Sequence, residues 1–370
     1  MKQTIITIND TFDIFYKYIE QKDIRSIYLV CGNSYKQSNF YQEFKKFIDI
    51  SRISLNVFSN FQPNPSLESI KNGVELFQEK INDVIIAVGG GSAIDVAKGI
   101  KYFSKKAKNS NYWQKAISEV ELIAIPTTAG SGSEATSFAV VYEGNIKLSL
   151  CDNKILPNTI IFCPQLLTTL PQYHKKMSLL DALCHGLESY WSINSTDKSK
   201  KLSHYAINTI IENFDAYFKC DKNAIVKIQK AAFYAGQAIN ISKTTAGHAL
   251  SYSLTKEFDI AHGYAVALVN KYLFPFMVEN IDKVCDPRGK KYLQEIFNNI
   301  SKAFGVRNPN EAIEKFIGIL EFLGIKELDA ADKNIDFFVN SVSLERLQNS
   351  PIFLEKNDIM TIYSKIFQRK

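Results

Sequence analysis

The sequence is poor in histidine and has no ordered cysteine pattern. Its 370 residues include five histidines and six cysteines. The cysteines form no CxxC pair and follow no regular spacing, which indicates reduced thiols and a cytoplasmic location. The chain also lacks an arginine-rich block and a nucleic-acid-binding motif, and its net charge of +6 is spread along the sequence. Binding to nucleic acid is therefore not expected, and the mild basicity is only weak evidence for an anionic ligand.

Long uninterrupted hydrophobic runs are missing as well. Acidic residues interrupt the N-terminal stretch MKQTIITINDTFDIFYKYIE, where a secretory signal needs an apolar core. The apolar stretch AVALVNKYLFPFMVENI contains Lys271 and Pro275, so it is predicted to be a buried helix and not a membrane span. A hydrophobic content of 46% and a charged content of 22% are those of an ordinary globular protein with a sizeable core.

Two domains are predicted, because 370 residues exceed the size at which a single core usually stops growing. Residues 1–164 alternate short β-branched runs, such as DVIIAVGGG and ELIAIPTT, with helical stretches. This alternation predicts an α/β domain around a mostly parallel, doubly wound sheet. Residues 165–370 have helical periodicity in segment after segment, which predicts an all-helical second domain.

A run of glycines follows a predicted strand in the stretch IIAVGGGSAIDVAKGI. Glycines at such a junction let backbone N–H groups approach a phosphate, and the following helix adds the partial positive charge of its N-terminus. A tight turn without a ligand is the alternative interpretation. The standard dinucleotide fingerprint GxGxxG is absent, so the run alone does not identify a nucleotide site.

Small hydroxyl residues cluster with two glycines where the next predicted strand ends, in AIPTTAGSGSEAT. Open α/β sheets bind ligands at the carboxyl ends of their strands. Taken alone, this stretch could be an ordinary Ser/Thr-rich loop. Beside the glycine run it indicates the second wall of one nucleotide-binding cleft, with Thr127, Thr128 and Ser131 among its side chains.

Four side chains, three of them from the scarce histidines, suggest a metal site. Asp181 and His185 are four residues apart in DALCHG, which places both on one face of a predicted helix. A surface pair without a metal is the alternative for these two residues alone. His248, in a predicted helix, and His262, in the stretch IAHG, would complete a set of one carboxylate and three imidazoles. Such a set suits a divalent transition metal.

These stretches together resemble the iron-containing, or group III, alcohol dehydrogenases. VGGGSAIDVAKG, IPTTAGSGSE, DALCHGLESY and the pair of His248 and IAHG occur in that family's order and spacing, over residues 25–275. The resemblance implies an α/β nucleotide-binding domain and an all-helical metal-binding domain, the architecture also found in dehydroquinate synthase. It further implies a metal between the domains, either Fe²⁺ or Zn²⁺, a nicotinamide cofactor and a homodimer.

The family's functional residues carry over onto matching positions. The resemblance implies that the metal ligands are Asp181, His185, His248 and His262. It implies that the cofactor is held at its pyrophosphate by Gly90, Gly91, Ser92 and Asp95, and at its ribose and nicotinamide end by Thr127, Thr128, Ser131 and Lys147.

The sequence departs from the family pattern where the adenosine ribose is expected. Many members carry an aspartate there, which holds the ribose and repels a 2′-phosphate. The stretch LVCGNSYKQ has Gly32 at that position, followed by the donors Asn33, Ser34 and Lys36. Loss of a carboxylate and gain of donors favours NADPH over NADH, unless the register of the comparison is shifted by one or two residues.

A second departure concerns the substrate. Tyr252 stands where many alcohol-oxidising members have a further histidine, and Lys243, Thr244 and Thr245 precede His248. A buried ammonium needs a partner, which an anionic substrate would supply; exposure of Lys243 to solvent is the alternative. The stretch resembles the subgroup that reduces phosphonoacetaldehyde to 2-hydroxyethylphosphonate. Sulfoacetaldehyde reductase, a lactaldehyde or general alcohol dehydrogenase, and a dehydroquinate synthase-like lyase remain as alternatives.

Overall fold

The computed structural model describes residues 3–8, 12–105, 115–144, 146–330, 334–342 and 347–368. The chain forms two compact units, residues 1–170 and 171–370. The predicted domain boundary at residue 164 falls at the first residue of helix α6 (Pro164–Thr168), which belongs to the first unit.

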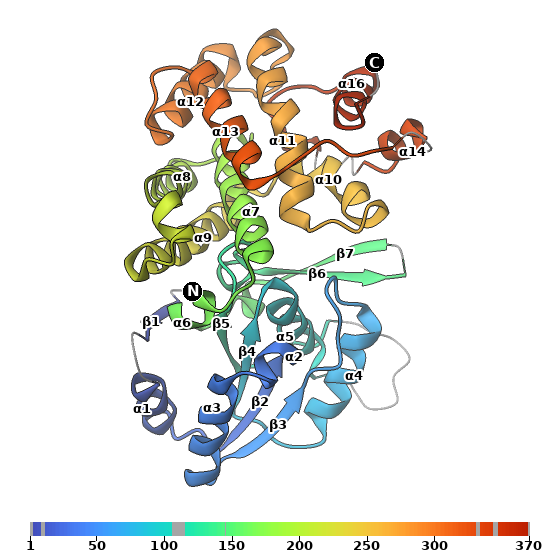
Figure 1. Ribbon diagram of the computed structural model, residues 1–370. Helices are drawn as coiled ribbons and strands as arrows, with labels where there is room; N and C mark the ends of the chain where they lie inside the picture. The colour runs from blue at the N-terminus through green and yellow to red at the C-terminus, as the bar shows by residue number, and fades with distance from the viewer. Residues whose placement is uncertain are drawn as a thin grey trace. The chain divides into compact units, whose positions relative to one another are not determined.

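The N-terminal unit is built on a parallel six-stranded sheet, with the strand order β1-β8-β5-β4-β2-β3 (Figure 1). Its strands are β1 (Thr4–Thr7), β2 (Ser26–Cys31), β3 (Ser54–Phe58), β4 (Val84–Gly89), β5 (Glu121–Pro126) and β8 (Thr159–Phe162). A separate antiparallel pair joins β6 (Phe138–Glu143) and β7 (Ile146–Cys151). The predicted mostly parallel sheet is confirmed.

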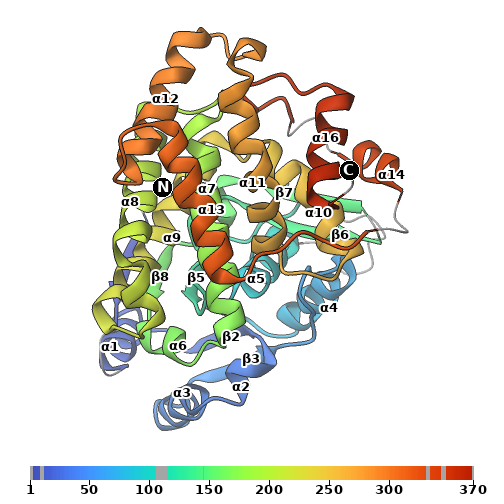
Figure 2. The same ribbon diagram turned by 45° about the horizontal axis from the view of Figure 1, so that its top comes forward.

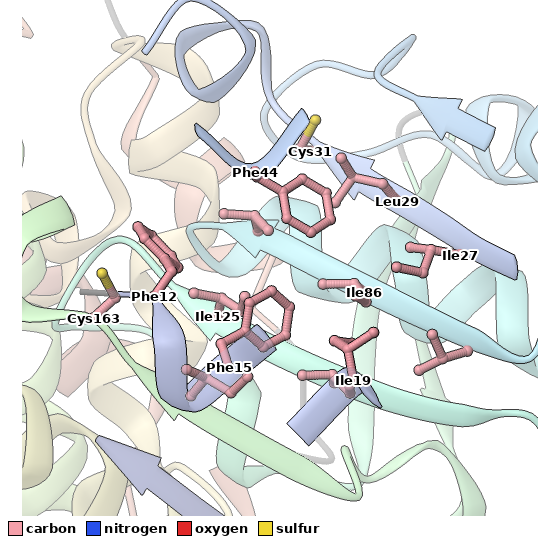
Figure 3. Close-up of a cluster of buried hydrophobic side chains, with 14 of the residues drawn as sticks. Phe12, Phe15, Ile19, Ile27, Leu29, Cys31, Phe44, Ile86, Ile125 and Cys163 are labelled. Carbon is pink, nitrogen blue, oxygen red and sulfur yellow. The ribbon is translucent and has the colours of Figure 1, made fainter. Parts of the chain in front are cut away.

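Helices cover both faces of this sheet, as expected for a doubly wound fold. On one face, α1 (Asp13–Gln21) and α3 (Asn39–Ile50) pack Phe15 and Phe44 against side chains of β2, β4 and β5 (Figure 3). On the other face, α4 (Leu67–Gln78) and α5 (Gly91–Phe103) pack against the alternate side chains of the same strands. Central strands such as β4 are therefore apolar in every position, because each side chain meets a helix.

Four strands were not predicted from the sequence. Strands β1 and β8 have only four residues each, too few for a periodic pattern to stand out. In the β6–β7 pair, the exposure of the side chains varies along both strands; β7 has no continuous apolar run, and the apolar run FAVVY of β6 was not recognised as a strand. The pair still matters for the site, because the backbone N–H of Val140 in β6 donates to Asp95 in α5.

The C-terminal unit is mostly helical, as predicted. In Figures 1 and 2, α8 and α9 lie on one side of α7, and α10, α11, α14 and α16 lie on the other. Its helices are α7 (Gln172–Trp191), α8 (Asp197–Phe218), α9 (Lys222–Ser242), α10 (Ala246–Glu257), α11 (His262–Glu279), α12 (Gly289–Ala303), α13 (Pro309–Leu323), α14 (Ile335–Asn340) and α16 (Lys356–Ile366). Within the described ranges, no helix combines the length and the apolar character needed to cross a bilayer.

Local signals set several of these helix ends. The side chain of Asn308 accepts a hydrogen bond from the backbone N–H of Glu311, Pro309 occupies the first turn of α13, and Gly324 follows its last turn with φ 81°. These are the residue types that favour a helix start and a helix stop. The predicted buried helix around Lys271 and Pro275 is α11, which contacts α7, α10, α13 and α16.

Candidate metal centre and cofactor loops

Helix α7 presents a row of polar side chains inside the C-terminal unit. Asp181, His185 and Glu188 are four and three residues apart, so they share one face of the helix. All three are buried, with exposed fractions of 8%, 5% and 0%. Buried ionisable groups are costly unless they are paired or bind a metal, so this row calls for a ligand or for strong partners.

Two neighbouring helices bring further histidines to this row. His248 lies in the first turn of α10, and His262 is the first residue of α11. Ligand atoms of Asp181, His248 and His262 all lie within 4.8 Å of one another. The ring of His185 stacks on that of His248 with centroids 4.7 Å apart, and its Nε2 lies 3.8 Å from Oδ1 of Asp181. The structure thus gathers all four predicted ligands.

The donor set fits a divalent cation. Oδ1 of Asp181 and Nε2 of His248 are buried, 3.7 Å apart, and neither atom has a hydrogen-bond partner among the described residues. Burial raises the pKa of Asp181, but the nearby charges of the three histidines outweigh this effect and hold it well below its usual value. One carboxylate oxygen and three imidazole nitrogens suit Zn²⁺ or Fe²⁺.

Glu188 is a site residue that the sequence reasoning missed. Its Oε1 lies 2.7 Å from Nδ1 of His248 and accepts from the amide of Asn270 at 3.1 Å. Its Oε2 accepts from the backbone N–H and the hydroxyl of Thr245, at 2.7 and 2.9 Å. Burial raises the pKa of Glu188, but the charge of His248 and these donors outweigh it and lower the pKa to about 2. Its position seven residues after Asp181 was the available signal.

His262 and Tyr252 form the more accessible side of the site. Both are partly exposed, and their rings stack with centroids 5.5 Å apart and an interplanar angle of 5°. Nδ1 of His262 lies 3.4 Å from the hydroxyl of Thr255. Tyr252 therefore lies against a predicted metal ligand, as its position in the sequence suggested.

The three residues ahead of His248 lie in different environments. Helix α10 begins at Ala246, so Thr244 precedes the helix. Lys243 is exposed and follows α9 with φ 63° and ψ 172°. Thr245 is fully buried, and its hydroxyl donates to Glu188 and accepts from Nε1 of Trp191. The hydroxyl of Thr245 is thus already engaged within the protein.

In the N-terminal unit, the two predicted cofactor loops meet. The backbone N–H of Thr127 donates to the carbonyl of Gly89 at 3.0 Å. A Cβ on Gly90 would lie 3.3 Å from the side chain of Thr128, and one on Gly91 would lie 2.8 Å from that of Ser131. Side chains at these two glycines would therefore push the loops apart. Ser92, in the first turn of α5, is partly exposed beside them.

Both carboxylate oxygens of Asp95 accept hydrogen bonds from within the protein. Its Oδ1 accepts from the hydroxyl of Ser133, and its Oδ2 accepts from the backbone N–H of Val140 at 2.9 Å. The buried Lys98 donates to Ser133, and burial lowers the pKa of this lysine to about 8. Both oxygens of Asp95 are therefore already bonded to protein donors, which compete with the predicted contact to the pyrophosphate region of the cofactor. Lys147 is partly exposed in β7, opposite Tyr142 in β6.

Gly32 lies at the carboxyl end of β2, as predicted. It has φ −74° and ψ 160°, which any residue can adopt, and a Cβ there would meet only the hydroxyl of Ser34, at 3.9 Å. Asn33 and Ser34 are exposed, and Nζ of Lys36 donates to the hydroxyl of Ser59 at 3.2 Å. Polar donors therefore surround a position that has room for a larger side chain.

Two family sequence models match the chain. The one described as iron-containing alcohol dehydrogenase matches residues 3–164, and the one described as Fe-containing alcohol dehydrogenase family, C-terminal, matches residues 175–367. Phosphonoacetaldehyde reductase from Streptomyces viridochromogenes is 28% identical over 295 residues, covering 75% of this chain and 74% of that protein. Alcohol dehydrogenase 4 from Saccharomyces cerevisiae is 26% identical over 368 residues, covering 95% and 93%.

Solved structures have the same fold. An iron-containing alcohol dehydrogenase from Thermococcus thioreducens superposes with a TM-score of 0.87 at 22% identity and covers 100% of this chain and 99% of its own. Sulfoacetaldehyde reductase from Bifidobacterium kashiwanohense, in complex with NAD⁺, superposes with a TM-score of 0.85 at 21% identity and covers 100% and 98%. At these identities the likeness establishes the fold and leaves the substrate open.

Proposed function

The chain belongs to the iron-containing alcohol dehydrogenase family, and from this membership we propose that it reduces a short anionic aldehyde, phosphonoacetaldehyde, with NADPH. The product would be 2-hydroxyethylphosphonate. Membership makes the protein an alcohol/aldehyde oxidoreductase and sets aside a dehydroquinate synthase-like lyase. The similarity to a phosphonoacetaldehyde reductase, at 28% identity, supports this substrate.

The inference of an anionic substrate rests on the backbone conformation of Lys243. Its φ of 63° with ψ of 172° lies in a region that is essentially restricted to glycine. A lysine there costs of order 1–3 kcal/mol, so its side chain needs a compensating role. Lys243 and Thr244 lead directly into α10, which carries His248 in its first turn. We propose that Lys243 and Thr244 bind the anionic group of the substrate. Thr245 is excluded from this role because it donates to Glu188.

The residues of the chain would bind and orient the reactants. Asp181, His185, His248 and His262 would hold a divalent cation, whose chemistry when bound is Lewis-acid polarisation of a carbonyl group. The glycine run and the hydroxyl loop would bind the dinucleotide, whose reduced nicotinamide supplies the hydride. Tyr252, whose ring stacks on that of His262, would take part in proton transfer to or from the substrate.

Steady-state NADPH oxidation by Fe²⁺-loaded protein tests the proposal. Phosphonoacetaldehyde is compared with sulfoacetaldehyde, lactaldehyde and butanal. A preference for the phosphonate supports the assignment, and a preference for the sulfonate would identify the other anionic aldehyde. Equal or higher rates with the neutral aldehydes would contradict the anionic substrate and leave a general alcohol dehydrogenase.

Replacing Lys243 with glycine should stabilise the protein and impair recognition of the anion at the same time. Relief of the backbone strain should raise the free energy of unfolding by about 1 kcal/mol. Loss of one charged hydrogen bond should raise KM for phosphonoacetaldehyde by about tenfold and leave KM for butanal unchanged. Lys256→Ala, at an exposed lysine in the last turn of α10, is the control and should change neither KM. Equal effects of Lys243→Gly on both aldehydes would mean that the lysine does not contact the anion.

The preference for NADPH can be tested at Gly32. Asp fits there without backbone strain, and its carboxylate should repel a 2′-phosphate and accept from a ribose hydroxyl. We expect Gly32→Asp to shift the ratio of kcat/KM for NADPH and NADH by about tenfold or more toward NADH. Gly32→Asn has the same size without the charge and should shift the ratio much less. A wild-type protein that already prefers NADH would contradict the cofactor assignment.

A further inference from the structure

We propose that Glu188 is a positioning residue that fixes the tautomer of His248, so that Nε2 of this histidine is the unprotonated, metal-binding nitrogen. The inference rests on the metal site of the proposed function and goes beyond it, because it assigns a role to a residue outside the four ligands. A neutral imidazole carries its proton on one nitrogen only, and the other nitrogen is the one that can bind a metal.

The contact on His248 determines where the proton lies. Nδ1 of His248 is 2.7 Å from Oε1 of Glu188, and an ionised carboxylate can only accept a hydrogen bond. His248 must therefore keep a proton on Nδ1, and in the neutral ring this is its only proton. Nε2 of the neutral ring then has a free lone pair, and it lies 3.7 Å from Oδ1 of Asp181.

The carboxylate cannot rotate away from this contact. Its other oxygen accepts from the backbone N–H of Thr245 at 2.7 Å, from the hydroxyl of Thr245 at 2.9 Å and from the backbone N–H of His248 at 3.3 Å. Two of these donors are backbone groups at the start of α10, where no side chain of the helix caps the end. One carboxylate thus caps α10 and orients the imidazole in its first turn.

The neighbouring residues leave space for this carboxylate. A Cβ on Gly247 would lie 2.3 Å from Oε1 of Glu188 and 2.5 Å from Oδ1 of Asn270, so only glycine fits there. Nδ2 of Asn270, in α11, donates to the same Oε1 at 3.1 Å. Residues from α7, α10 and α11 therefore converge on one carboxylate oxygen, the one that contacts His248.

Replacing Glu188 with glutamine tests the role with almost no change of volume. The backbone donors of Thr245 and His248 require an oxygen at the Oε2 position, so the amide NH₂ must face Nδ1 of His248. An NH₂ group donates, which moves the proton of His248 to Nε2 and blocks metal binding there. The amide of Asn270 can turn over to accept, because its Oδ1 has no partner among the described residues.

Two readouts measure this effect. Nitrogen-15 spectra of histidine-labelled protein without metal, recorded at a pH high enough for the His248 ring to be neutral, show which ring nitrogen carries its proton, and five histidines keep the spectrum simple. Zn²⁺ affinity is measured by competition with a chelator. We expect Nδ1–H in the wild type and Nε2–H in Glu188→Gln, with Zn²⁺ affinity lower by about 10–100-fold. Glu327→Gln makes the same change at a glutamate bonded to Lys271 and Tyr272, and both readouts should stay as in the wild type.

Each result decides the proposal. A neutral His248 with its proton on Nε2 in the wild-type spectrum overturns it, even if Glu188→Gln does not fold. Wild-type Zn²⁺ affinity in a folded Glu188→Gln protein also overturns it. Failure of the wild type to bind Zn²⁺ would contradict the proposed metal site itself, and with it this inference. Failure of the aldehyde assays alone, with Zn²⁺ binding intact, would contradict the proposed substrate and leave the role of Glu188 standing.

Discussion

The variant His262→Ala is expected to lose turnover by about 10³-fold or more, together with most of its bound metal. Polarisation of a carbonyl by a metal contributes several kcal/mol to the transition state, which corresponds to a loss of this size. His262 is the first residue of α11 and one of three residues whose ligand atoms lie within 4.8 Å of one another. The fold should survive, because the ring of His262 is partly exposed and stacks on that of Tyr252 at the accessible side of the site.

Metal content by elemental analysis and kcat/KM for the aldehyde are the measurements, with circular dichroism to check folding. His174→Ala is the matched control, since His174 is an exposed histidine in the first turn of α7. That control should keep its metal and its activity. A His262→Ala protein with full metal content and turnover would remove His262 from the ligand set.

The variant Gly263→Ala should destabilise the C-terminal unit far more than the same substitution at an exposed glycine. A Cβ there would lie 2.0 Å from the backbone carbonyl oxygen of Met177 and 3.1 Å from Cβ of Asp181. A backbone atom cannot swing aside as a side chain can, so α11 must move away from α7. We expect a loss of about 3 kcal/mol and a fall in Tm of roughly 6–12 °C.

The control for this variant is Gly318→Ala in α13. Gly318 is exposed, and a Cβ there meets no atom within 4 Å among the described residues. Alanine favours a helix over glycine, so Gly318→Ala should be neutral or stabilising by up to about 1 kcal/mol. Thermal unfolding of the two variants gives the comparison. Equal Tm values would mean that α7 and α11 are not packed as closely as described.

The sequence was most informative where a pattern is local. The three helices of the site, at Asp181, at His248 and around Lys271, were predicted, and the spacing of Asp181 and His185 placed both on one face. The glycine run and the hydroxyl loop were predicted to act together, and Gly90 and Gly91 do pack against Thr128 and Ser131. Each of these signals depends on residues within one turn, or on one strand end and its loop.

Contacts between segments that are distant in the sequence could not be predicted from local patterns. Glu188 and Thr245 are 57 residues apart, and only the tertiary structure makes them hydrogen-bond partners. The sequence assigns Thr245 to the substrate because it precedes His248, but its buried hydroxyl donates to Glu188 and accepts from Trp191. Asp95 was assigned to the pyrophosphate because of its place after the glycine run, yet β6, a strand that was not predicted, supplies a donor to it.

Because all four proposed ligands lie on α7, α10 and α11, metal binding should affect how fast the protein is degraded in the cell. A cation that binds the folded state alone would raise the free energy of unfolding of this unit by RT ln(1 + [M]/Kd), or about 4 kcal/mol at a thousandfold excess over Kd. The supply of metal would then set how often the three helices separate and expose their chain to proteases. Metal starvation would thus lower the abundance of the protein as well as its activity.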